Sequence, residues 1–104
     1  MNLTIESSDT PAGVILTVQG EVDMESSPRL RDEIKKVVKR KPAALKLKLE
    51  NVPYIDSSGV AVLIEGLRWC GKEKIAFTLV SISASVRGVL QLSKLMTVFK
   101  VEEG

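Results

Sequence analysis

The segment Asp56-Ser57-Ser58-Gly59 has the most unusual local composition in this chain of 104 residues, because it directly precedes an apolar run that begins at Val60. Asp, Ser and Gly all satisfy free amide groups at the start of a helix, so an N-cap is the simplest explanation of the segment. One cap is sufficient, which leaves the second serine hydroxyl available for other chemistry. A helix N-terminus also stabilises an added phosphate through its free amides and its dipole.

The remaining residue types exclude several kinds of catalysis. The chain has no histidine, so hydrolases with a histidine base, metal sites with histidine ligands and histidine phosphocarriers are excluded. Its single cysteine, Cys70, cannot form an internal disulfide, and we interpret it as a packed thiol. Asp23 and Asp56 could form a carboxylate pair, but no nucleophile, base and oxyanion set accompanies them. We therefore expect no enzyme activity, no metal and no cofactor, and no Walker-type phosphate loop is present.

The net charge of +2 conceals an uneven distribution along the chain. Residues 1–34 carry a net charge of −5, whereas residues 35–48 carry seven basic residues and no acidic one. Such a basic run suggests a nucleic acid or an anionic membrane as partner. However, Lys35 to Lys41 fall in the last turns of an expected helix, where cations complement the macrodipole, and Lys46 and Lys48 alternate with leucines on a strand. We therefore favour a structural explanation and expect no nucleic-acid partner.

Nothing in the sequence indicates export or insertion into a membrane. The N-terminal residues 1–10 lack a basic region followed by an apolar core, so they do not resemble a secretory signal. The longest apolar stretch, residues 60–64, is far shorter than the ~20 residues that a membrane-spanning helix needs. We expect a soluble, cytoplasmic protein.

The first half of the chain contains a predicted hairpin and a helix. Alternating apolar residues over 3–18, interrupted by a turn at 9–13, predict two strands that end near Gly20. Ser26-Ser27-Pro28 then predicts a helix start, with a hydroxyl N-cap and proline at the first helical position. Pro42 ends this helix.

The second half alternates strands with helices. Leucines alternate with charged residues over 45–50, which predicts a half-buried strand. The helix that follows Gly59 is expected to bury Val60, Leu63, Ile64 and Leu67 and to end at Gly71. The last expected elements are a strand over 75–82, a helix that begins at Ser83 or Ser85, and a strand over 98–101.

This order of elements predicts the fold class. Strands that alternate with helices require crossover connections, which favour parallel pairing. We therefore expect an α/β protein with a mixed, mostly parallel sheet of four to five strands and helices packed against it. A chain of this length supplies one hydrophobic core, so residues 1–104 are expected to form a single domain.

Three segments resemble one known family, the STAS domain. They are Gly20-Glu21-Val22-Asp23, residues 54–60 (Tyr-Ile-Asp-Ser-Ser-Gly-Val) and residues 83–90 (Ser-Ala-Ser-Val-Arg-Gly-Val-Leu). They occur in the family's order on the expected elements, and the similarity extends from about Leu3 to Val101. Within the family, the chain looks most like the bacterial anti-sigma factor antagonists.

The resemblance implies a function and a set of site residues. The serine directly after the aspartate, Ser57, would be the phosphorylation site, with Ser58 as the fallback. The kinase would be an anti-sigma factor that binds the unphosphorylated antagonist and thereby frees a sigma factor; a serine phosphatase would reset the cycle. Asp23 would lie beside Ser57, and the partner-binding residues would be Asp23, Asp56, Ser57, Ser58 and Gly59.

A second function remains open from the same resemblance. Small STAS proteins also resemble the cytoplasmic subunit that braces the ATPase of bacterial phospholipid-transport ABC systems, where the same helix start would be a docking surface without a phosphate. Family members commonly continue into a further helix after the last strand, whereas this sequence stops at Gly104. The sheet edge could then support self-association, and we expect a monomer or a weak dimer.

Overall fold

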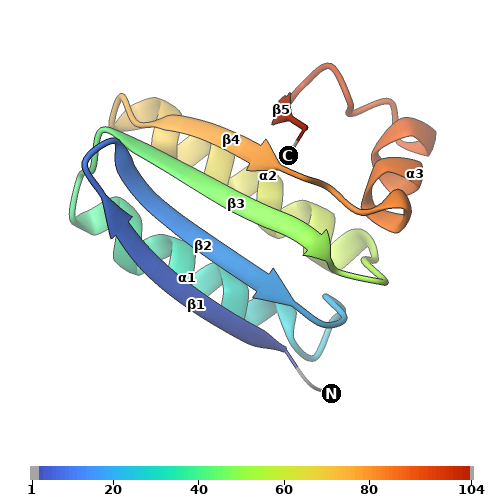
Figure 1. Ribbon diagram of the computed structural model, residues 1–104. Coiled ribbons are helices and arrows are strands. Elements are labelled where there is room, and N and C mark those ends of the chain that lie inside the picture. The colour runs from blue at the N-terminus through green and yellow to red at the C-terminus, as the bar shows by residue number, and fades with distance from the viewer. Residues whose placement is uncertain (1–2, 104) are drawn as a thin grey trace.

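Five strands form one sheet in the order β1-β2-β3-β4-β5, with three helices packed beside it (Figure 1). The structure is a computed structural model, and it describes residues 3–103. Strands β1 and β2 pair antiparallel, and every other neighbouring pair is parallel. The predicted α/β fold with a mixed, mostly parallel sheet is therefore confirmed. The elements are β1 (Thr4–Thr10), β2 (Gly13–Gln19), α1 (Ser27–Lys39), β3 (Ala44–Asn51), α2 (Ser57–Lys72), β4 (Ala76–Val80), α3 (Ala84–Leu92) and β5 (Lys100–Glu102).

One face of the sheet forms the core. Because side chains alternate along a strand, every second residue of β2 and β3 points to the same face. The alternating leucines of β3 are all buried there, as the sequence predicted, and Leu47 lies between Leu16 of β2 and Leu79 of β4. Helices α1 and α2 lie next to each other behind this face (Figure 1). Lys46 and Lys48 occupy the opposite face, which the helices leave uncovered.

The crossover connections bring the starts of α1 and α2 to one edge of the sheet. Each helix follows the carboxyl end of a parallel strand, so the β2–α1 and β3–α2 loops are neighbours. Beyond the strand ends, Val22 and Ile55 form one further parallel bridge between these loops. The loops that carry Asp23 and Asp56 are thereby placed side by side.

The start of α1 differs from the prediction. Ser26 is the N-cap residue, but its side chain does not cap the helix; its backbone is already helical, with φ −97° and ψ −22°. Its hydroxyl instead donates to the carbonyl of Glu21 at 2.8 Å. Ser27 is the first helical residue, so Pro28 follows it at the second position.

The end of α2 also differs from the prediction. Gly71 lies inside the helix, which continues to Lys72. The left-handed residue that ends the helix is Lys74, with φ 60°, and Lys41 and Lys94 occupy the same place after α1 and α3 with φ 52° and 58°. A non-glycine residue pays roughly 1–2 kcal/mol in this conformation. A lysine there, however, places its charge near the negative end of the helix dipole.

The last two strands differ from their expected ranges, since β4 is shorter and β5 begins later in the chain. Strand β4 covers Ala76–Val80 rather than 75–82, and β5 covers Lys100–Glu102 rather than 98–101. Of the two candidate starts of α3, Ser83 is the N-cap. Its hydroxyl accepts from the Val86 amide at 3.1 Å and donates to the Val52 carbonyl at 2.6 Å, which ties α3 to the β3–α2 loop.

The buried face of α2 is rotated from the expected stripe. Val60 and Leu63 are buried as predicted, but Ile64 and Leu67 are only half-buried; Val62, Gly66 and Cys70 are buried in addition. Gly66 permits this, because a Cβ atom there would lie 3.2 Å from the Phe77 ring. Burial raises the pKa of the Cys70 thiol to about 11, which agrees with a packed, unreactive cysteine. Within residues 3–103, no helix combines the length and apolar character needed to cross a bilayer.

Two glycines of α2 should respond oppositely to substitution by alanine. A Cβ atom on Gly59 would lie 2.6 Å from Ile55 Cγ1 and 2.7 Å from Val22 Cγ1, whereas one on Gly71 would meet no atom of residues 3–103 within 4 Å. We expect Gly71→Ala to raise the free energy of unfolding by about 0.5–1 kcal/mol. Gly59→Ala should lower it by about 1–3 kcal/mol through overpacking. Urea denaturation measures both, and changes of the same sign would contradict the packing described here.

Candidate functional site

The candidate site lies where the β2–α1 and β3–α2 loops are joined through their backbones. The Val22 amide donates to the Tyr54 carbonyl at 2.9 Å, and the Asp56 amide donates to the Val22 carbonyl at 3.1 Å. These bonds hold the residue after Val22 and the start of α2 at one edge of the sheet. Asp23 and Asp56, which the family resemblance assigns to the partner-binding surface, line the same shallow depression, along with Met24 and Glu25.

Asp56 is the N-cap of α2. Its backbone is extended, and its Oδ1 atom accepts from the amides of Ser58 at 2.9 Å and Gly59 at 3.3 Å. The same oxygen accepts from the Ser58 hydroxyl at 2.5 Å. The cap that the sequence predicted in this segment is therefore present, and the carboxylate supplies it.

The electrostatics of Asp56 follow from these bonds. The hydrogen bond from the Ser58 hydroxyl lowers the pKa of the Asp56 carboxyl below its usual value. Partial burial opposes this effect, while the backbone amides of Gly59, Ser58 and Met24 add to it. Asp56 is thus a carboxylate at neutral pH, and the Met24 amide of the neighbouring loop also favours its charged form.

The two serines of the segment have different environments. The Ser58 hydroxyl is bound to Asp56, and Ser58 is half-buried. Ser57 is the first residue of α2 and is exposed, and within residues 3–103 its hydroxyl makes no hydrogen bond to protein. Of the two hydroxyls, only that of Ser57 is both accessible and uncommitted.

Asp23 and Gly59 mainly fix the positions of the two loops that form the site. Asp23 Oδ1 accepts from the amides of Glu25 and Ser26, both at 3.0 Å, so this carboxylate organises the β2–α1 loop. Gly59 is buried, and the space its side chain would need is filled by Val22 and Ile55. Gly59 can contribute to binding only through the position of the loop. Asp23 and Asp56 line the same depression, and in the described part of the chain Asp23 makes no hydrogen bond to Ser57.

Sequence reasoning missed two apolar residues at this edge of the sheet. Met24 is 77% exposed and Tyr54 is 49% exposed, although both belong to the joined loops. The sequence offered one indication of an exposed apolar side chain. Met24 lies between Asp23 and Glu25 in a loop whose turn needs no apolar residue. Periodicity could not reveal it, because Met24 lies outside every strand and helix.

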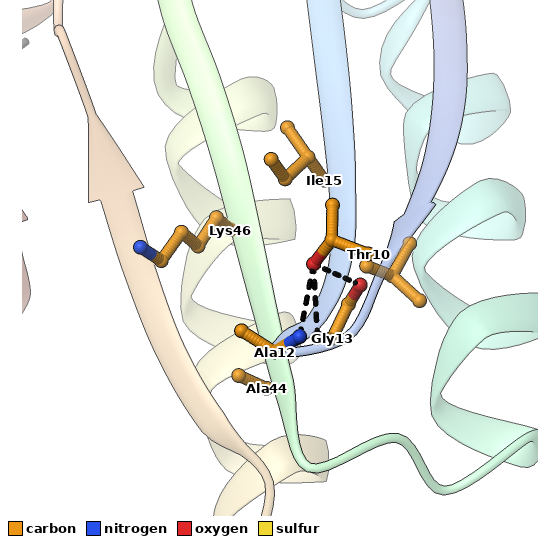
Figure 2. Close-up of a pocket in the computed structure, with 7 residues that line it drawn as sticks. Thr10, Ala12, Gly13, Ile15, Ala44 and Lys46 are labelled. Carbon is orange, nitrogen blue, oxygen red and sulfur yellow. Dashed lines mark hydrogen bonds between the residues drawn. The ribbon is translucent and has the colours of Figure 1, made fainter.

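A second cavity, at the turn between β1 and β2, does not form a site (Figure 2). Its volume is about 40 Å³, and its lining includes Thr10, Gly13 and Lys46. The Thr10 hydroxyl accepts from the amides of Ala12 at 3.2 Å and Gly13 at 3.1 Å and donates to the Gly13 carbonyl at 2.9 Å. These bonds stabilise the hairpin turn and leave this hydroxyl without a free hydrogen for a ligand.

The cap by Asp56 should make stability depend on pH. Asp56→Ala removes the acceptor of two helix amides, so the free energy of unfolding at pH 7 should fall by about 0.5–2 kcal/mol. Because the folded state lowers the pKa of this carboxyl below 3.8, its contribution is complete above that pH and is lost as the pH falls through the folded pKa. Urea denaturation at pH 7 and near pH 3 should therefore show a smaller deficit in acid.

Asp32→Ala is the matched control for this prediction. Asp32 is exposed on α1 and, within residues 3–103, forms no ion pair. Its removal should change the free energy of unfolding by less than about 0.5 kcal/mol. A deficit for Asp56→Ala that is the same at both pH values, or that Asp32→Ala reproduces, would contradict the capping role.

Comparison with known proteins agrees with the fold and with the resemblance. The sequence matches the model of the STAS domain over residues 2–104. It is 24% identical over 104 residues to the anti-sigma-B factor antagonist of Staphylococcus aureus strain NCTC 8325, covering 100% of this chain and 96% of that protein. It is 22% identical over 101 residues to the anti-sigma-B factor antagonist of Bacillus subtilis, covering 97% and 92%.

Solved structures give the same result. An anti-sigma factor antagonist from Mycobacterium paratuberculosis superposes with a TM-score of 0.88 at 29% identity, covering 97% of this chain and 86% of that one. The phosphorylated form of the Bacillus cell fate determinant SpoIIAA superposes with a TM-score of 0.76 at 21% identity, covering 99% and 91%. The chain belongs to the STAS domain family, and these relatives within it are anti-sigma factor antagonists.

Proposed function

We propose that this protein is an anti-sigma factor antagonist whose binding to an anti-sigma serine kinase is switched by phosphorylation of Ser57. The observation that carries the proposal is the free, exposed hydroxyl of Ser57 at the first position of α2, next to a Ser58 hydroxyl that is already bound to Asp56. The names of the relatives support the choice of function. SpoIIAA, which has this fold, is known in a phosphorylated form.

The proposed chemistry takes place on a hydroxyl of this chain with groups supplied by the partner. Ser57 Oγ attacks the γ-phosphorus of ATP bound to the kinase, the bond from that phosphorus to the β-phosphate oxygen breaks, and ADP leaves. The hydroxyl proton passes to a base of the kinase. A phosphatase later hydrolyses the phosphoserine with water and returns the free hydroxyl and inorganic phosphate.

The geometry of the cap explains how a phosphate would act on binding. A phosphate at a helix start is usually held by the free amides. Here the amides of Ser58 and Gly59 already donate to Asp56, so a phosphate on Ser57 would stay on the surface beside a carboxylate. It would add about −1.5 to −2 charges there. The folded domain tolerates an exposed charge, whereas a partner that covers the site must desolvate it.

The energy required for such a switch is modest. A hundredfold loss of affinity corresponds to about 2.7 kcal/mol. Burying one poorly paired phosphate beside Asp56 is sufficient for this change. No rearrangement of the sheet or of α2 is needed, so the phosphorylated and unphosphorylated forms should have the same fold.

Phosphorylation by the cognate anti-sigma kinase should be specific for Ser57. Incubation with this kinase and radiolabelled ATP should label the wild type and Ser58→Ala, because Ser58 contributes to the cap and not to the reaction. Ser57→Ala should remain unlabelled, and mass spectrometry should locate the phosphate of the wild type on Ser57. Labelling of Ser57→Ala to the wild-type level would contradict the assignment.

Binding should respond to the phosphate and not to the loss of the hydroxyl. In calorimetric titrations with the kinase and ADP, Ser57→Ala should bind within about threefold of the wild type. The purified phosphoprotein should bind about a hundredfold more weakly, which corresponds to about 2.7 kcal/mol. Equal affinities of the two forms would contradict the switch. Stable co-purification from the host with an ATPase and a permease would instead favour a transporter subunit.

A further inference from the structure

Exposed apolar side chains are unevenly distributed over the described residues. Four large ones are exposed, namely Met24, Tyr54, Leu92 and Val98. Two of them, Met24 and Tyr54, lie in the two loops that the Val22 backbone joins at the candidate site. Single exposed apolar residues are common on protein surfaces, but two in adjoining loops around one functional segment require an explanation.

The backbone around Met24 is held in place on both sides. On its C-terminal side, the amides of Glu25 and Ser26 donate to Asp23 Oδ1 at 3.0 Å. On its N-terminal side, the Asp23 amide donates to the Ser26 hydroxyl, also at 3.0 Å. The Met24 amide also contributes to the lowered pKa of Asp56. This ordered turn presents a side chain that remains 77% exposed, so a partner can bury it at little cost in backbone entropy.

The surroundings of Met24 are acidic. It lines a depression together with Asp23, Glu25 and Asp56, and Glu21 is exposed in the same loop. On α2, Ala61 is exposed one helical turn after Ser57 and therefore shares its face. The surface around Ser57 thus combines one flexible apolar side chain, a small apolar residue and several carboxylates.

We propose that Met24 is the apolar anchor of the partner-binding surface around Ser57, and that its partner is a protein with an apolar pocket bordered by lysine or arginine side chains. The proposal rests on the proposed function in one respect, since the partner is taken to be the anti-sigma kinase. Protein interfaces concentrate their binding energy in a few buried apolar or aromatic anchors within a polar rim. Methionine adapts well to such pockets, and the carboxylates complement a basic border.

Truncation of Met24 tests the anchor directly. In calorimetric titrations with the cognate anti-sigma kinase and ADP, Met24→Ser should raise Kd by about tenfold or more, as expected for an interface anchor. Met24→Leu should restore binding to within about threefold of the wild type. Leu92→Ser is the matched control, because Leu92 is 87% exposed at the far end of α3 and should leave Kd unchanged. The proposal is overturned if Met24→Ser binds like the wild type, or if Leu92→Ser weakens binding equally.

The carboxylates around Met24 are tested separately, through the salt dependence of the association rate constant. Attraction between a carboxylate rim and a basic partner accelerates association, and salt screens it. The association rate constant of the wild type should therefore fall as NaCl is raised, and Glu25→Lys should both slow association and reduce this salt dependence. Glu25 is exposed and, within residues 3–103, forms no ion pair, so the substitution should leave the fold intact. Association that is independent of salt in both proteins would exclude a basic border.

Labelling of Ser57 separates this inference from the proposed function. At saturating kinase, Met24→Ser should still be phosphorylated on Ser57, because its hydroxyl is unchanged. If the wild type is labelled on Ser57 but Met24→Ser binds equally well, the anchor is wrong and the switch stands. If Ser57→Ala is labelled like the wild type, the switch is wrong, and the affinities of the Met24 variants still decide the anchor.

Discussion

The site depends on the parallel pairing of β2 and β3, which continues past the ends of both strands. The bridge between Val22 and Ile55, with the hydrogen bonds from Val22 to Tyr54 and from Asp56 to Val22, connects two loops that are more than thirty positions apart in the sequence. Gly59 allows α2 to begin directly against this bridge, since any side chain there would overlap Val22 and Ile55. Without this contact, the start of α2 and the β2–α1 loop would not share a surface.

The cap by Asp56 makes the two neighbouring serines of α2, Ser57 and Ser58, differ in their ability to react. One carboxylate oxygen binds the Ser58 hydroxyl and two helix amides, which leaves the Ser57 hydroxyl as the free group. The same bonds lower the pKa of Asp56, so its carboxylate form persists to lower pH than that of an ordinary aspartate. A helix start that would ordinarily attract a phosphate is thus already neutralised by a side chain of its own. The fold therefore needs no phosphate at Ser57 for its stability, which is what a reversible modification requires.

Sequence reasoning succeeded where structure is set by local pattern and failed where it is set by tertiary contacts. The alternation over residues 45–50 predicted β3 and its buried face, because side-chain direction along a strand is a local property. The hydroxyl cap expected within Ser26-Ser27-Pro28 was wrong, because Asp23 binds the loop amides there and the side chain of the N-cap residue does not cap the helix. Gly71 was misread as a helix end, and Lys74 takes the left-handed conformation instead. Composition singled out the segment from Asp56 to Gly59 as a helix start, and the choice of Ser57 within it came from the family resemblance. The exposure of Met24, by contrast, depends on how two distant loops meet.

The charge asymmetry of the sequence constrains how the proposed switch can work. The basic residues at the end of α1 are partly paired, as in the contacts of Arg40 with Asp9 and Lys41 with Glu73, and lie away from the acidic loops at the helix starts. A partner with a basic border would be attracted by these acidic loops, and long-range attraction alone would strengthen after phosphorylation. Release must therefore arise at short range. An apolar pocket of the partner around Met24, in a depression shared with Asp56, supplies the reason. A phosphate on the adjacent Ser57 would be desolvated against apolar groups, while the amides of Ser58 and Gly59 already donate to Asp56.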